Sequence, residues 1–190
     1  MEVPLHTRRP KRNEPRSGVS IGTVKNLPKW SGAKVMIKVK WACKNLANHI
    51  HYIQHREKDT EKRQLITEKG SIDEKDFINE VNKSGKRYFK LIISPEEKLS
   101  KEELGSVVKD TMKELEKRYG KLTYAFVMHE NTEHFHAHVV LAGRSKSRSP
   151  VRITKKTLFD MKEAAVDRIF YIKEEHNRER SILRTLFRKE

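Results

Sequence analysis

Residues 122–142 read LTYAFVMHENTEHFHAHVVLA, and their pattern is the clearest indication of the fold. Two apolar segments, 122–129 and 134–141, flank the polar residues 130–133. Such segments on either side of a short polar loop are typical of two antiparallel strands joined as a β-hairpin. One face of this hairpin is apolar throughout, so we expect helices to cover it.

Four of the nine histidines lie in this hairpin, at His129, His134, His136 and His138. A four-residue loop places His129 opposite His134, and side chains alternate along a strand, so all four imidazoles share one face. Clustered imidazoles repel one another once protonated near pH ~6.5, whereas neutral imidazole is a natural ligand of a divalent metal. Three histidine ligands leave coordination positions open, as in catalytic metal sites. The plainer interpretation is a set of surface histidines on a hairpin.

The rest of the chain alternates strand-like and helix-like segments. The order of these segments predicts an α+β fold: a single domain with a central antiparallel sheet covered by helices, and a flexible basic N-terminal arm. Apolar periodicity and stop signals such as Gly120 set the boundaries. We expect helices at 45–56, 76–81, 101–119 and 156–178, strands at 33–41, 88–94, 122–129 and 134–141, and a turn or short hairpin at 64–67.

Charge and cysteine content narrow the class of protein. The chain has 190 residues, with 42 Lys and Arg against 26 Asp and Glu, a formal net charge of +16 that favours a nucleic-acid partner. Its single cysteine, Cys43, excludes an internal disulfide framework and a multi-cysteine zinc site. No apolar run suits a membrane span or a signal peptide, so we expect a cytoplasmic protein. We expect a basic flexible arm at 1–31, a folded domain at 32–180 and a basic tail at 181–190.

Residues 129–140, HENTEHFHAHVV, resemble the third motif of conjugative relaxases. These are tyrosine nickases of the HUH endonuclease superfamily, which is named for a His-hydrophobe-His pair. The sequence is most similar to the P class of plasmid mobilisation relaxases, over about residues 33–175. By that resemblance His129, His136 and His138 are the three metal ligands.

The motif departs from the family pattern at two positions. The family usually has Asp where this chain has Asn131, and it often has Asn where this chain has Ala142. By the resemblance His134 lies beside the ligands without binding the metal. Asn131 and Glu133 would support the ligands from outside, with Glu133 as a substitute for the missing carboxylate.

The resemblance also requires a nucleophilic tyrosine, which in the P class lies on a helix just after the first strand. Tyr52 matches that position. On a helical wheel Tyr52 falls off the apolar stripe of its helix, with His49 and Arg56 beside it. Arg56 would hold a phosphate, and His49 would help the phenol lose its proton.

The rival nucleophile is Tyr171, in the helix at 156–178. Replication initiators and some transposases of the same superfamily place their tyrosine after the histidine pair. Tyr171 also lies off its apolar stripe, but Asp167, Glu174 and Glu175 surround it and would repel a scissile phosphate. We therefore favour Tyr52.

The resemblance implies site- and strand-specific nicking of single-stranded DNA at a plasmid or integrative-element origin of transfer. A 5′-phosphotyrosyl intermediate would initiate conjugative transfer, with accessory relaxosome proteins and a coupling protein as partners. The resemblance implies Mn²⁺ or Mg²⁺ as the metal in function, whereas imidazole ligands alone favour Zn²⁺, Cu²⁺ or Ni²⁺. The cations expected to contact DNA phosphates, besides those of the arm, are Lys38, Lys40, Lys90, Arg144, Lys146 and Arg148.

Three interpretations stay open at this point. The first is a relaxase that uses Tyr52. The second is a rolling-circle replication initiator or a transposase that uses Tyr171. The third is a nonenzymatic DNA- and metal-binding module with a decayed site, which the departures at Asn131 and Ala142 would explain.

Overall fold

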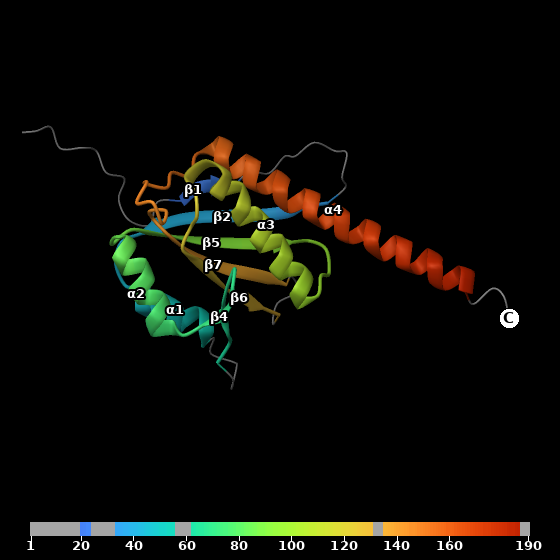
Figure 1. Ribbon diagram of the computed structural model, residues 1–190, viewed down its shortest axis with the longest axis horizontal. Helices are drawn as coiled ribbons and strands as arrows, with labels where there is room; N and C mark the ends of the chain where they lie inside the picture. The colour runs from blue at the N-terminus through green and yellow to red at the C-terminus, as the bar shows by residue number, and fades with distance from the viewer. Residues whose placement is uncertain (1–19, 24–32, 56–61, 131–134, 187–190) are drawn as a thin grey trace, which may run out of the picture.

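The computed structural model (Figure 1) describes residues 20–23, 33–55, 62–130 and 135–186. Within these residues seven strands form one antiparallel sheet in the order β1-β2-β5-β7-β6-β3-β4. The strands are β1 (Ser20–Thr23), β2 (Val35–Ala42), β3 (Leu65–Thr67), β4 (Gly70–Ile72), β5 (Tyr88–Pro95), β6 (Tyr124–His129) and β7 (His136–Ala142).

Four helices accompany the sheet in the described part of the chain, which confirms the α+β prediction. They are α1 (Leu46–Gln54), α2 (Glu74–Ser84), α3 (Lys101–Tyr119) and α4 (Lys155–Leu186). α3 has the bounds that its periodicity predicts. Ser100 and Glu103 form a capping box at its start, and Gly120, at φ 74, ends it. None of these helices combines the length and apolar composition that a membrane crossing needs.

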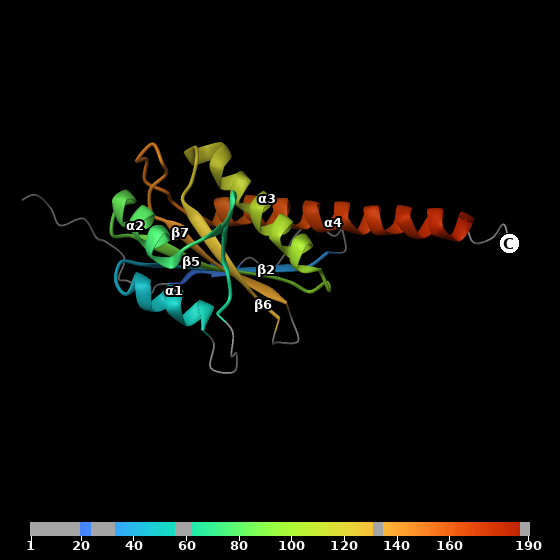
Figure 2. The ribbon, with the colours of Figure 1, turned by 60° about the horizontal axis from the view of Figure 1, so that its bottom comes forward.

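One face of the sheet is covered by α3 and α4 (Figure 2). Every second residue of β2, β5, β6 and β7 points into this core, as the alternation predicts: Ile37 of β2, Leu91 of β5, Phe126 of β6 and Val139 of β7 are all buried. Both helices add their apolar stripes to the same cluster, and Met112 of α3 is fully buried there. This apolar layer holds the sheet together.

The opposite face is only partly covered, by α1 and α2. Ile50 and Ile53 of α1 pack there with Val127 of β6 and Val140 of β7. The prediction that helices cover the apolar face is confirmed by α3 and α4, and two shorter helices lie on the histidine face as well. Small and branched apolar side chains on the histidine face form the surface on which these two short helices bury their apolar stripes.

The register of the hairpin also differs from the prediction. β7 begins at His136, which pairs with His129, so His129 does not pair with His134. A shift of two residues preserves the face on which every side chain lies. The prediction that His129, His136 and His138 share one face is therefore confirmed, and β7 lies in the middle of the sheet.

One strand was not predicted, and two helices extend beyond their predicted bounds. β1 lies inside the range assigned to the N-terminal arm and pairs with β2 at the edge of the sheet. α2 is longer than the helix expected at 76–81 because it begins at the cap of Asp73, whose side chain accepts a hydrogen bond from the Lys75 amide. α4 continues past Arg178 to Leu186, crossing the expected domain boundary at 180.

Candidate active site

Three histidines converge on the face of the sheet that α1 and α2 partly cover. His129 ends β6, and His136 and His138 stand two residues apart on β7, so the strand pairing brings them together. One ring nitrogen of each lies within 4.8 Å of the others. The ring centroids are 5.4 Å apart for His129 and His136, 4.7 Å for His129 and His138, and 5.1 Å for His136 and His138.

The chemistry of this donor set fits a divalent metal ion. Imidazole nitrogen is a ligand of first-row transition metals, and three such ligands leave positions open for phosphate oxygens or water. The three histidines differ in solvent exposure: His129 is 2 % exposed, whereas His136 and His138 are half-buried. A metal held here would therefore meet solvent and substrate from the side of β7.

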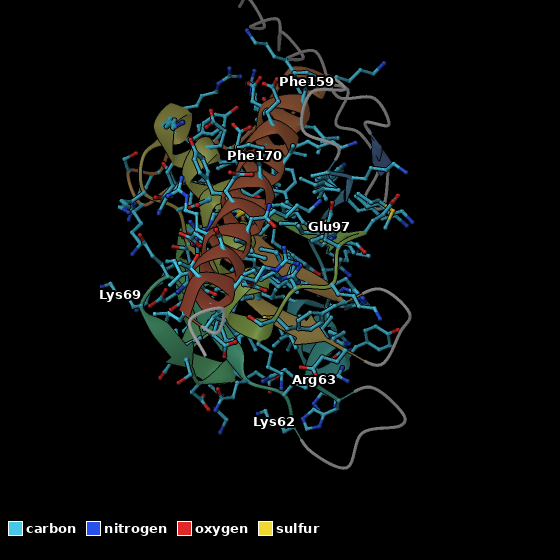
Figure 3. The ribbon with its side chains drawn as sticks, turned by 90° about the vertical axis from the view of Figure 1, so that its right-hand side faces the viewer. Lys62, Arg63, Lys69, Glu97, Phe159 and Phe170 are labelled. Carbon is cyan, nitrogen blue, oxygen red and sulfur yellow. The ribbon has the colours of Figure 1, made fainter. Side chains whose placement is uncertain are left out.

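Arg63 is a site residue that the sequence analysis missed. It lies just before β3, and its Nη1 is in hydrogen-bonding contact with Nδ1 of His129. The Arg63 amide donates to the Gln54 carbonyl at 3.1 Å, and Gln54 Nε2 donates to the Arg63 carbonyl at 2.8 Å. Gln54 is the last residue of α1, so Arg63 joins the end of that helix to His129. Figure 3 shows Arg63 next to Lys62, at the end of the sheet where α1 lies.

The two candidate tyrosines lie on opposite faces of the sheet. Tyr52 of α1 is 58 % exposed and Tyr171 of α4 is 61 % exposed, so exposure does not separate them. α1 packs on the histidine face, and Tyr52 lies two residues before Gln54. Ile169 and Ile172, which flank Tyr171, are buried in the core between α4 and the other face. Figure 3 shows Phe170, the residue before Tyr171, far from Arg63.

His49 occupies a partly buried position beside Tyr88. The two rings stack with centroids 6.4 Å apart at an interplanar angle of 28°. Burial, together with the positive charge of Lys90, lowers the pKa of His49 to about 4. The ring is therefore neutral near pH 7 but is a weak proton acceptor.

Three of the predicted DNA-binding lysines form a row on the histidine face. Lys40 of β2 pairs with Lys90 of β5, and Lys38 pairs with Ile92, which in turn pairs with His138 of β7. Neighbouring strands lie about 4.8 Å apart, so the backbone of Lys38 is about 10 Å from that of His138. Burial and the nearby charge of Lys40 lower the pKa of Lys90. A bound phosphate would relieve this crowding of positive charge.

The other predicted DNA-binding residues lie elsewhere. Arg144, Lys146 and Arg148 belong to the loop that follows β7, at the opposite end of that strand from His136. Seven residues of β7 at about 3.3 Å each separate the two ends by roughly 20 Å. The structure therefore does not bring this loop to the histidines. Arg56, Asn131, Glu133 and His134 lie outside the described residues.

Comparison with known proteins identifies the family. The family model described as relaxase, MobA/VirD2-like, nuclease domain matches residues 52–169, more than half of the chain. That range begins at Tyr52, includes the three converging histidines and stops before Tyr171. No curated protein and no solved structure matches the chain. The resemblance that the histidine motif suggested is therefore confirmed: the chain belongs to the MobA/VirD2-like relaxases, nucleases that nick DNA at an origin of transfer.

Proposed function

We propose that this relaxase nicks single-stranded DNA by metal-dependent transesterification, with Tyr52 as the nucleophile. The observation that carries the proposal is the convergence of His129, His136 and His138 on the face of the sheet to which α1 brings Tyr52. Accessory relaxosome proteins and a coupling protein would be its partners at the origin of transfer.

The proposed chemistry exchanges one phosphoester for another. The Tyr52 oxygen attacks the scissile phosphorus, the bond from phosphorus to the 3′ oxygen breaks, and the tyrosine remains attached to the 5′ phosphate. The phenol proton leaves, and the departing 3′ oxygen gains a proton to become a hydroxyl. Because no high-energy bond is consumed, the same step run backwards can reseal a strand when transfer ends.

Positive charge is the main aid that these residues give to the reaction. A phenol has a pKa near ~10, so it keeps its proton near pH 7. Nearby cations stabilise the phenolate and make the proton easier to remove. Lys40 and Lys90 lie on the same face and would also hold the phosphates that flank the nick. His49 is too weak a base for the proton, whereas His55, exposed one turn after Tyr52, is a candidate acceptor.

The three histidines would hold a divalent metal, as the family generally requires. When bound, such an ion polarises a non-bridging phosphate oxygen and stabilises the charge that develops in the transition state. His129 is fixed by its burial at the end of β6, and His136 and His138 are fixed by the central strand. The ligand positions are therefore set by the sheet itself, which favours a constant geometry around the phosphate.

Paired substitutions test the nucleophile. Tyr52→Phe removes only the attacking oxygen, so it should abolish the covalent adduct with a single-stranded oligonucleotide and leave DNA affinity nearly unchanged. Tyr171→Phe is the matched control, since Tyr171 is equally exposed. Loss of the adduct in Tyr171→Phe and its retention in Tyr52→Phe would overturn the proposal in favour of an initiator-like enzyme. Retention in both would exclude both tyrosines.

A further inference from the structure

The contact between Arg63 and His129 has a direct consequence for metal binding. A guanidinium is always charged near neutral pH and has only donors, so the nitrogen that it contacts must be the acceptor. Nδ1 of His129 is therefore unprotonated in this arrangement, and the proton of the neutral ring lies on Nε2.

A metal ion can reach His129 through either ring nitrogen, and the guanidinium opposes both routes. Through Nδ1, the ion needs the lone pair that Arg63 Nη1 already occupies. Through Nε2, the ion needs the nitrogen that carries the proton, and the proton cannot move to Nδ1 while Arg63 donates there. Ligation through Nε2 with Arg63 in place would require the ring to lose its remaining proton and become an imidazolate. Neutral imidazole does not readily lose that proton.

We propose that Arg63 competes with the metal ion for His129, so that the ion must displace the guanidinium before His129, His136 and His138 can act together. Electrostatics strengthens the competition, because a guanidinium close to the ligand set repels a divalent cation. The inference rests on the metal dependence proposed above and adds the residue that controls it.

The backbone of Arg63 is independent of this exchange. Its amide and carbonyl remain bonded to Gln54 whichever way the side chain points. The displaced guanidinium therefore stays at the end of α1, near the helix that carries Tyr52. The loss of the side chain should likewise leave the attachment of α1 intact, which makes the position suitable for substitution.

The test is a titration of the full chain with Mn²⁺, without DNA, in which electron paramagnetic resonance reports the free ion. Arg63→Met should bind Mn²⁺ about tenfold more tightly than the unaltered protein, since single and double positive charges about 5 Å apart repel by at least that factor even in water. Arg63→Lys keeps the charge but loses the planar fork, so its affinity should fall between the two.

Lys62→Met is the matched control. It removes one positive charge from the adjacent residue, whose Nζ pairs with Glu74 at 3.4 Å. Its Mn²⁺ affinity should stay close to that of the unaltered protein. Equal affinities for Arg63→Met and the unaltered protein, or weaker binding by Arg63→Met, would overturn the inference while leaving the proposed function intact. Absence of Mn²⁺ binding in all four proteins would contradict the metal-dependent function itself, and the inference with it.

Discussion

The two faces of the central sheet use the same strands for opposite purposes. On the face under α3 and α4 the alternate residues are apolar and buried, as Phe126 and Val139 are. On the other face the intervening positions include a row of lysines and the three histidines. The helices α1 and α2 cover only part of that face. Clustered cations and imidazoles are unfavourable in a core. The apolar packing under α3 and α4 therefore stabilises the sheet, and the histidine face could not hold its site in place without that packing.

The largest expected effect is the loss of stability from the packed face. Phe126 is 1 % exposed, so Phe126→Ala should lower the free energy of unfolding by about 3–5 kcal/mol. Urea unfolding followed by circular dichroism measures this change. A loss below about 1 kcal/mol would mean that the apolar face does not carry the fold.

Alanine substitutions on the histidine face should affect metal binding strongly and stability only slightly. His136→Ala with His138→Ala removes two of three ligands, and we expect Mn²⁺ binding to become undetectable by calorimetry. Both side chains are only half-buried, so the midpoint of urea unfolding without metal should change little. Unchanged Mn²⁺ affinity in this double variant would show that the ion binds elsewhere.

The lysine row on the histidine face can be compared with the basic loop that follows β7. Changing Lys38, Lys40 and Lys90 to Gln should flatten the slope of log K against log salt by about 2, at about 0.7 for each lost phosphate contact on single-stranded DNA. The matched control changes Arg144, Lys146 and Arg148 to Gln. Fluorescence anisotropy with a short oligonucleotide centred on the nick site should show no change in slope for the control. The opposite ranking would place the DNA at the loop end of β7.

The smallest effect concerns His49 and acid stability. Its pKa of about 4 in the folded protein lies below that of an unfolded histidine, near ~6.5. As the pH falls through this window the unfolded chain gains a proton that the folded chain does not, so stability is lost. His49→Gln should therefore lessen the fall in unfolding free energy between pH 7 and 5. An identical pH dependence in the two proteins would mean that the His49 ring is not desolvated.

Local patterns were enough to predict the strands around the histidines and the bounds of α3. The period of two at Val35, Ile37 and Val39, and the stop at Gly120, act within a few residues and are readable in sequence. β1 escaped notice because a four-residue edge strand containing a glycine has too few alternating positions to be recognised.

The features that the sequence did not reveal depend on contacts between distant residues. Arg63 and His129 are 66 positions apart, and an isolated arginine before a short strand carries no signal of its own. The placement of α1 and α2 depends on which sheet surface is left for their apolar stripes, not on the stripes alone. The pairing of His129 with His136 depends on the length of the connection, which composition does not fix.

Identification of the covalently modified residue distinguishes the two tyrosines without any substitution. After reaction of the unaltered protein with an oligonucleotide, nuclease trimming and proteolysis, mass spectrometry locates the tyrosine that carries the nucleotide. The proposed mechanism predicts one modified peptide, containing Tyr52 from the face that holds the three histidines. A nucleotide on Tyr171, which α4 holds on the opposite face, would contradict it.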